Sequence, residues 1–141
     1  MFAEDLVMTG RLQIALNGEV VKEVPNLVVA AGKEYVASRI KDTTKNAMSH
    51  MAVGTSSTSP GSADTTLGSE ANRQLLTSTT VTDNTITYVA TFDPGEGTGA
   101  LAEAGIFNAA SAGDMLCRTT FAVINKGAAD SMTITWVVTV S

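Results

Sequence analysis

Two runs of alternating apolar and polar residues lie near the start of the chain, and an Asn-Gly dipeptide separates them. The first run covers residues 11–16, and the second covers residues 19–24. Asn17 and Gly18 both tolerate the positive φ angles of a type I′ turn, which joins two strands through a two-residue loop. The pattern therefore predicts a β-hairpin in this part of the chain.

A helical spacing follows the hairpin. Tyr35, Val36, Arg39 and Ile40 are separated by the intervals of one face of an α-helix. The spacing predicts one short helix over residues 32–41. We expect its apolar side to lie on a sheet and its polar side to stay in solvent. The inward set is Tyr35, Val36 and Ile40, and the outward set is Lys33, Glu34, Lys41 and Asp42.

Alternation with a period of two residues dominates the second half of the chain. In residues 85–92 the larger residues fall on one face and threonines dominate the other. Asp83-Asn84 precedes this run as a turn signal, so residues 73–82 and 85–92 are predicted to form a second hairpin. The inward residues of the later strand are Ile86, Tyr88, Ala90 and Phe92.

The last ten residues, 132–141, alternate most regularly. Five large apolar residues share one face, and the other face carries mostly hydroxyl groups. A strand this apolar on one face is expected to be paired on both sides, because an exposed edge of this kind promotes aggregation. The five inward residues are Met132, Ile134, Trp136, Val138 and Val140.

Residues 48–54, 99–108 and 115–123 are further strand candidates, which brings the expected total to about eight strands and one helix. Residues 55–63 are small, polar and rich in helix and strand breakers, so they are interpreted as a surface loop within one domain and not as a linker. Short strands with a turn signal every eight to twelve residues are typical of an all-β fold. We predict an antiparallel β-sandwich or a jelly-roll-like domain.

The predicted domain spans residues 1–141. Residues 1–46 would hold the hairpin, an arm and the helix, and residues 47–141 would hold the main sandwich strands. A chain of 141 residues, 44% of them hydrophobic, is long enough to bury a core without metals or disulfides.

Composition narrows the possible functions. Apolar runs are far shorter than a membrane span, so we expect no membrane partner. The first residues lack the basic and apolar regions of a secretory signal, which favours synthesis in a cytoplasm. One cysteine, Cys117, and one histidine, His50, leave little material for Cys/His metal sites. We expect no cofactor and no metal, and we expect both residues to be ordinary strand residues.

The acidic charge is unevenly distributed. Residues 47–141 carry the whole net charge of −5, because they hold only three basic residues beside eight acidic ones. Nucleic-acid binding normally needs a basic stripe that neutralises phosphates. We therefore expect no nucleic-acid partner.

The segment of residues 93–99 is rich in glycine and contains two acidic residues, which are features of phosphate-binding and calcium-binding loops. It lacks the lysine and the following helix of a phosphate loop. Its acidic residues do not have the spacing of a calcium-binding loop. We interpret it as a connection between strands.

Glu103 is the most unusual charged residue in the pattern. By alternation it shares a face with Leu101, Gly105 and Phe107, where a carboxylate needs a partner. Arg118 lies on the next predicted strand, so we predict a structural Glu103–Arg118 ion pair.

Glu70 and Arg73 are three residues apart and are expected to pair in a similar way. Neither pair predicts catalysis, because an arginine partner keeps a carboxylate ionised. We expect no catalytic residue and no enzyme.

Three blocks of residues 51–141 resemble recurring blocks of tailed-bacteriophage virion structural proteins. The first block is Met51-Ala52-Val53-Gly54-Thr55 with Pro60, Thr66-Leu67-Gly68-Ser69-Glu70 and Arg73. The second is residues 86–92 with Gly95-Glu96, Gly99, Leu101 and Glu103-Ala104-Gly105-Ile106-Phe107-Asn108. The third is Gly113, residues 115–121 and residues 132–136. Thr98 and Cys117 depart mildly from the pattern, which commonly has asparagine and alanine there.

The resemblance implies a capsid decoration, or cement, protein, or a related tail-fibre or collar domain. The short acidic chain favours decoration of the outer shell. The implied partner is the major capsid protein, and the implied location is the virion surface after synthesis in the host cytoplasm. A homo-oligomer, either a trimer or a dimer, is also expected. The alternative function is a tail-fibre or collar module, structural or receptor-binding, that uses loops 55–63 or 94–99.

The N-terminal segment is the predicted contact region. Phe2, Leu6, Val7 and Met8 are apolar residues outside the repetitive strand pattern. A terminus stays ordered only when something holds it, so these residues are candidates for capsid contact. The alternative is that the segment adds a strand to its own sheet.

Overall fold

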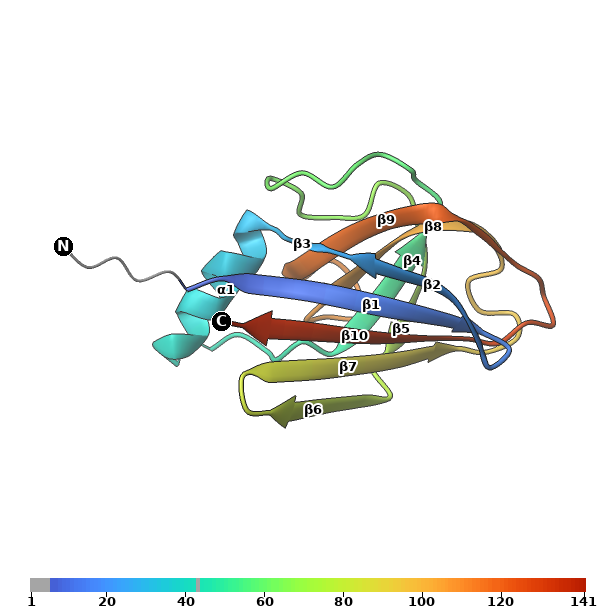
Figure 1. Ribbon diagram of the computed structural model, residues 1–141. Helices are drawn as coiled ribbons and strands as arrows, with labels where there is room; N and C mark the ends of the chain where they lie inside the picture. Colours follow the sequence, from blue (N-terminus) through green and yellow to red (C-terminus); the bar gives the residue numbers. More distant parts are fainter. Residues whose placement is uncertain (1–5, 43) are drawn as a thin grey trace.

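The computed structural model describes residues 6–42 and 44–141, which form two five-stranded antiparallel sheets and one helix (Figure 1). The first sheet has the order β2-β1-β10-β7-β6, and the second has the order β3-β9-β8-β4-β5. The first sheet consists of β1 (Met8–Leu16), β2 (Glu19–Pro25), β6 (Ser78–Thr82), β7 (Thr85–Phe92) and β10 (Met132–Val140). The second consists of β3 (Leu27–Val28), β4 (His50–Gly54), β5 (Glu70–Leu75), β8 (Gly99–Phe107) and β9 (Met115–Lys126), and the helix is α1 (Ala30–Ile40).

The two predicted hairpin turns are present. Asn17 and Gly18 have φ angles of 50° and 84°, as a type I′ turn between β1 and β2 requires. Asp83 has a φ of 52° in the turn that joins β6 to β7. The prediction for the last strand is also confirmed, because β10 lies between β1 and β7 and pairs with both.

The sheets face each other across one hydrophobic core. Trp136 of β10 is fully buried there with residues of both sheets, and its indole Nε1 donates a 3.0 Å hydrogen bond to Asn26 Oδ1. A smaller buried cluster, formed by Val29, Ala52, Leu67, Phe107 and Met115, is separate from this main core. The second sheet is therefore covered on both faces over part of its area, and its outer face can bury side chains of its own.

The chain changes sheets where the sequence predicted one continuous strand. Residues 73–82 divide between β5 in the second sheet and β6 in the first, so the predicted hairpin partner of residues 85–92 is β6 alone. At the crossover, Leu76 N–H donates to Ser49 O and Thr77 N–H donates to Val89 O. The alternation pattern shows which residues share a face but not which sheet a strand joins. This division, with the two-residue β3, gives ten strands among the described residues, where the sequence predicted about eight.

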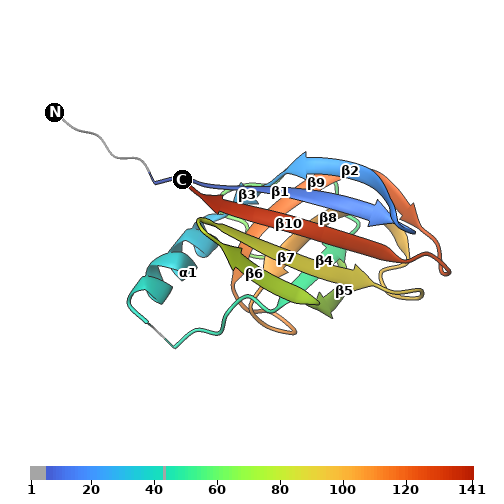
Figure 2. The same cartoon turned by 60° about the horizontal axis from the view of Figure 1, so that its bottom comes forward.

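The helix begins earlier than predicted and is oriented differently. Tyr35 is buried as expected, and Gly32 packs directly against the backbone of Leu116 on β9. The helical spacing places Ile40 on the inward face, but its side chain is 81% exposed. The physical reason is that α1 covers one end of the sandwich, where only part of the helix has a neighbouring strand (Figure 2).

The N-terminal hairpin belongs to the sandwich. The hairpin of β1 and β2 completes the first sheet through a nine-pair register between β1 and β10. Among the described residues, no helix is long and apolar enough to cross a membrane.

Candidate functional site

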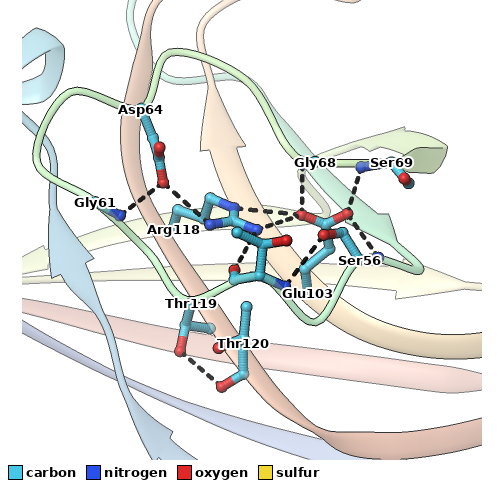
Figure 3. Close-up of polar contacts among 10 residues, drawn as sticks. Ser56, Gly61, Asp64, Gly68, Ser69, Glu103, Arg118, Thr119 and Thr120 are labelled. Carbon is cyan, nitrogen blue, oxygen red and sulfur yellow. Dashed lines mark hydrogen bonds and ion pairs between the residues drawn. The ribbon is translucent and has the colours of Figure 1, made fainter.

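A long loop connects β4 to β5 and crosses the outer face of the second sheet. It covers residues 55–69, which is longer than the loop predicted at residues 55–63. Two charged side chains lie beneath it, Glu103 from β8 and Arg118 from β9 (Figure 3). Glu103 has no exposed surface, and Arg118 is 2% exposed. We refer to this arrangement of residues 55–69 with Glu103 and Arg118 as the loop clamp.

Glu103 binds the loop through backbone amides. Its Oε1 accepts a hydrogen bond from Gly68 N at 2.7 Å. Its Oε2 accepts hydrogen bonds from Ser69 N at 2.7 Å and from Ser56 N at 3.1 Å. One carboxylate therefore holds both ends of the loop, where the chain leaves β4 and where it enters β5.

Arg118 binds the same carboxylate and the middle of the loop. Its Nη2 and Nε lie 2.9 and 3.2 Å from Glu103 Oε1. Its Nη1 lies 3.0 Å from Asp64 Oδ2, and its Nη2 also donates to Thr58 O at 2.9 Å. The planar guanidinium holds its N–H groups in a fixed fork, so Arg118 binds Glu103 through Nε and Nη2 while it also contacts Asp64 and Thr58.

The contacts around Glu103 favour its ionised form. Burial raises the cost of the charge, but hydrogen bonds from Gly68, Ser69, Arg118 and Ser56 outweigh it, so the pKa of Glu103 lies below its ordinary value. A carboxylate held in this way is a poor general acid, because it does not carry a proton near neutral pH. The geometry supports a structural function for the pair.

Small residues allow the loop to approach the sheet closely. A Cβ atom at Gly54 would collide with Ser69 O and with the Glu103 carboxylate. On the same outer face, Leu67 of the loop is buried beside Phe107 and Gly105. Apolar packing therefore supports the polar contacts of the loop clamp.

Arg73 forms a second anchor on β5. Its Nη2 and Nε bind the two carboxylate oxygens of Glu70 at 2.7 and 3.0 Å, which is the pairing expected from the sequence. Its Nη1 donates to Ala109 O and Ala112 O, both at 2.9 Å, and its guanidinium carbon lies 3.8 Å from the centre of the Phe107 ring. Arg73 thus connects β5 to the turn between β8 and β9.

The prediction of which residues share a face of β8 with Glu103 is only partly correct. Gly105 and Phe107 share the outer face with Glu103, but Leu101 packs in the main core between the sheets. A register shift between Leu101 and Glu103 in the β8–β9 pairing reverses the alternation at this point. A single strand pattern does not predict such a bulge.

The predicted contact residues fall in two environments. Leu6 and Val7 are 75% and 48% exposed, whereas Met8 begins β1 and packs partly against the main core. Val7 also exchanges backbone hydrogen bonds with Ser141, which extends the pairing of β1 with β10. Phe2 lies outside the described residues.

The other candidate residues lie apart from the loop clamp. The ring of His50 is hydrogen-bonded to Ser49 at 2.7 Å, and burial together with nearby Arg73 lowers the pKa of His50. Cys117 is fully buried, which raises the pKa of its thiol. Residues 93–99 connect β7 to β8.

Among residues 6–42 and 44–141, no group of three or more His, Cys, Asp or Glu side chains could hold a metal ion.

Two further residues make polar contacts that the sequence does not predict. Asp64 completes the coordination of Arg118, but it lies 54 residues away from it in the chain. Lys126 is 1% exposed, and its Nζ donates to Asp93 O and Asp130 O. Both contacts depend on loop conformation, and no local pattern signals them.

Comparison of the chain with protein-family models, with curated proteins and with solved structures finds no match in any of the three.

Proposed function

We propose that this protein is a phage capsid decoration, or cement, protein that binds the outer shell and stabilises neighbouring major capsid subunits. The observation that carries the proposal is the convergence of the virion-like sequence blocks on the loop clamp. Gly54, Leu67 and Gly68 belong to the first block, Glu103 to the second and Arg118 to the third. Residues spread over more than 60 positions thus act together in one structural element.

The chemistry of the loop clamp supports a role without catalysis. Both oxygens of Glu103 are occupied by five hydrogen-bond contacts, and Arg118 is bound to Glu103, Asp64 and Thr58. Because these side chains direct their hydrogen bonds to other groups of the protein, they hold the loop surface in shape. A rigid surface reduces the entropy lost on binding a partner.

The N-terminal segment supports a docking surface for the shell. Leu6 and Val7 are exposed apolar residues beside the paired ends of β1 and β10. In the proposal they contact the major capsid protein together with Phe2, and Met8 contributes less because it packs partly against its own core. Many copies on one symmetric shell would add modest individual interfaces into strong overall binding.

We also propose that the fold is jelly-roll-like, that the protein is located on the virion and that it forms a homo-oligomer. The nested pairing of strands that lie far apart in the sequence, β1 with β10, β3 with β9 and β4 with β8, supports a jelly-roll-like arrangement. Neither nucleic acid nor membrane is a partner in this proposal, and the acidic charge supports the first of these points.

Copy number provides the first test. Quantitative mass spectrometry of purified particles from the source would measure this chain relative to the major shell protein. A ratio near a simple fraction of the shell count is expected for decoration. Absence of the chain from the particles would overturn the proposal.

A pair of variants tests the contact residues. Val7→Ser should reduce co-sedimentation with undecorated shells, because it removes an exposed apolar contact. Val123→Ser is the matched control, since Val123 is 55% exposed on β9 of the second sheet, whereas Val7 adjoins the first sheet. Equal shell binding by both variants would contradict the assignment of the contact surface.

The second candidate function is a structural or receptor-binding module of a tail fibre or collar. It is favoured by the exposed small residues Ser57, Thr58 and Ser59, which the loop clamp holds in a fixed conformation. A receptor-binding surface benefits from such preorganisation. A copy number of a few chains per particle would favour this function over decoration.

A further inference from the structure

The four sheet edges differ in how they are protected against pairing with another strand. Charged side chains, proline, bulges and short length are the usual protective features of an edge. The edge strand β2 has charged residues, Pro25 and a register shift opposite β1. The edge strand β3 is only two residues long.

The other two edge strands, β5 and β6, differ most in their protection against pairing. The edge strand β5 contains Glu70 and Arg73, and its pairing with β4 has a register shift. The edge strand β6, with the sequence Ser-Thr-Thr-Val-Thr, has no charge and no proline, and its register with β7 is regular. All five residues of β6 are exposed. Among the described edges, β6 is therefore the one best suited to accept another strand.

An apolar hollow lies beside β6 and contributes a second observation. Its volume is about 430 Å³, and it lies between α1, residues 47–48 and the strands β6 and β7. Thr79 and Val81 of β6 line it, and Val81 and Ile40 are 69% and 81% exposed. The lining contains one charged side chain, Arg39. An uncharged strand edge therefore continues directly into uncovered apolar surface.

We propose that β6 pairs antiparallel with β6 of a second copy of this chain, with the two-fold axis at Thr80. A strand without charge is self-complementary, because no like charges meet across the axis. In this register Val81 lies opposite Thr79 of the second copy. Asp83 lies opposite Thr77, which keeps the two aspartates at opposite ends of the pair. The inference does not depend on the proposed function.

The two-fold axis also explains how the hollow is covered. An axis perpendicular to the sheet keeps the inner faces of both first sheets on the same side. The two hollows then open toward each other across the β6 pair, and each exposed Val81 and Ile40 approaches the other copy. A five-residue strand alone is smaller than a stable interface, which generally buries about 1,000 Å² or more, so this apolar surface is needed for stability.

Disulfide formation tests the register directly. Thr80→Cys should form a covalent dimer under mild oxidation, because the two-fold axis places this residue opposite itself. The native Cys117 is buried and does not compete. Val123→Cys is the matched control on an exposed part of β9, and it should remain monomeric on a non-reducing gel. Equal cross-linking of the two variants, or none with Thr80→Cys, would overturn the proposed register.

Sedimentation analysis tests the dimer without a covalent bond. The full chain should be dimeric at micromolar concentration, and Val81→Lys should weaken the dimer by at least tenfold because it places two ammonium groups at the seam. Val123→Lys should leave the dimer unchanged, and both variants should keep the circular dichroism and melting temperature of the folded chain. A monomeric parent chain, or an oligomer insensitive to Val81→Lys, would refute the proposal.

Discussion

Glu103 illustrates how a buried charge is made tolerable by many small contacts. Its carboxylate is fully buried, and the amide groups of Ser56, Gly68 and Ser69 share its stabilisation with Arg118. A buried ion pair by itself is weak evidence for stability, because desolvation of both charges is costly. The contribution of this pair depends on its backbone hydrogen bonds, and these also position the loop.

Removing the charge of Glu103 should make stability less sensitive to acid. Because its folded pKa lies below its unfolded value, Glu103 stabilises the fold fully above its unfolded pKa, about 4.3. That contribution is lost as the pH falls through the folded pKa. Glu103→Gln should lower the free energy of unfolding by about 3 kcal/mol at pH 7. The difference from the parent chain should shrink below about pH 4.3 in urea titrations.

An exposed carboxylate provides the control for this measurement. Glu34 is exposed on α1, and Glu34→Gln should have an effect within about 0.5 kcal/mol at every pH. A constant difference between Glu103→Gln and the parent chain from pH 7 to pH 3 would contradict the pKa direction.

Gly54 should tolerate no side chain. In Gly54→Ala the new methyl group would meet Ser69 O and the Glu103 carboxylate, so the loop clamp must shift. We expect a loss of about 1–3 kcal/mol in thermal or urea unfolding. Gly61→Ala is the matched control within the same loop, because its nearest atom would be Asp64 Oδ1 at 3.6 Å. Similar losses in the two variants would show that close packing at Gly54 is not the cause.

At the scale of elements, the loop of residues 55–69 is ordered by its anchors and not by strand pairing. Asp64 binds both Arg118 Nη1 and Gly61 N, which holds the middle of the loop. The Glu103 contacts hold its two ends. Substitution of Asp64 should therefore loosen the middle of the loop without releasing its two ends.

Asp64→Ala should loosen the middle of the loop while leaving the sandwich intact. Asp64 is partly exposed, so the loss of global stability should be at most about 1 kcal/mol. Hydrogen exchange of the amides in residues 58–66 should accelerate, and exchange in β10 should not change. Glu34→Ala on α1 is the control. Unchanged exchange in residues 58–66 would show that Asp64 does not hold the loop.

At the scale of the whole molecule, the two sheets should unfold together. Residues of both sheets belong to one buried cluster, and Trp136 lies fully buried within it. We expect fluorescence of Trp136 and far-ultraviolet circular dichroism to give coincident unfolding curves. Calorimetry should show a single transition with an enthalpy of about 100 kcal/mol, as expected for a domain of this size. Two separate transitions would contradict a single cooperative domain.

Local chemistry by itself determined several features of this protein. Asn17-Gly18 specifies the first hairpin turn because both residues accept positive φ angles. The alternation in residues 132–141 specifies a strand with one buried face. The isolated carboxylate of Glu103 on an apolar face predicted a partner, and Arg118 lies 2.9 Å away. Each of these inferences depends on neighbours in sequence or on the cost of burying a charge.

Only the tertiary structure decided how these elements combine. It placed β5 and β6 in different sheets, left Ile40 exposed at the end of the sandwich, and turned Leu101 into the main core through a bulge. It also brought Asp64 to Arg118. Alternation specifies the face of a strand but not its neighbour, because the same pattern satisfies either sheet. Contacts between distant segments depend on loop paths, which are stabilised only after the sheets have assembled.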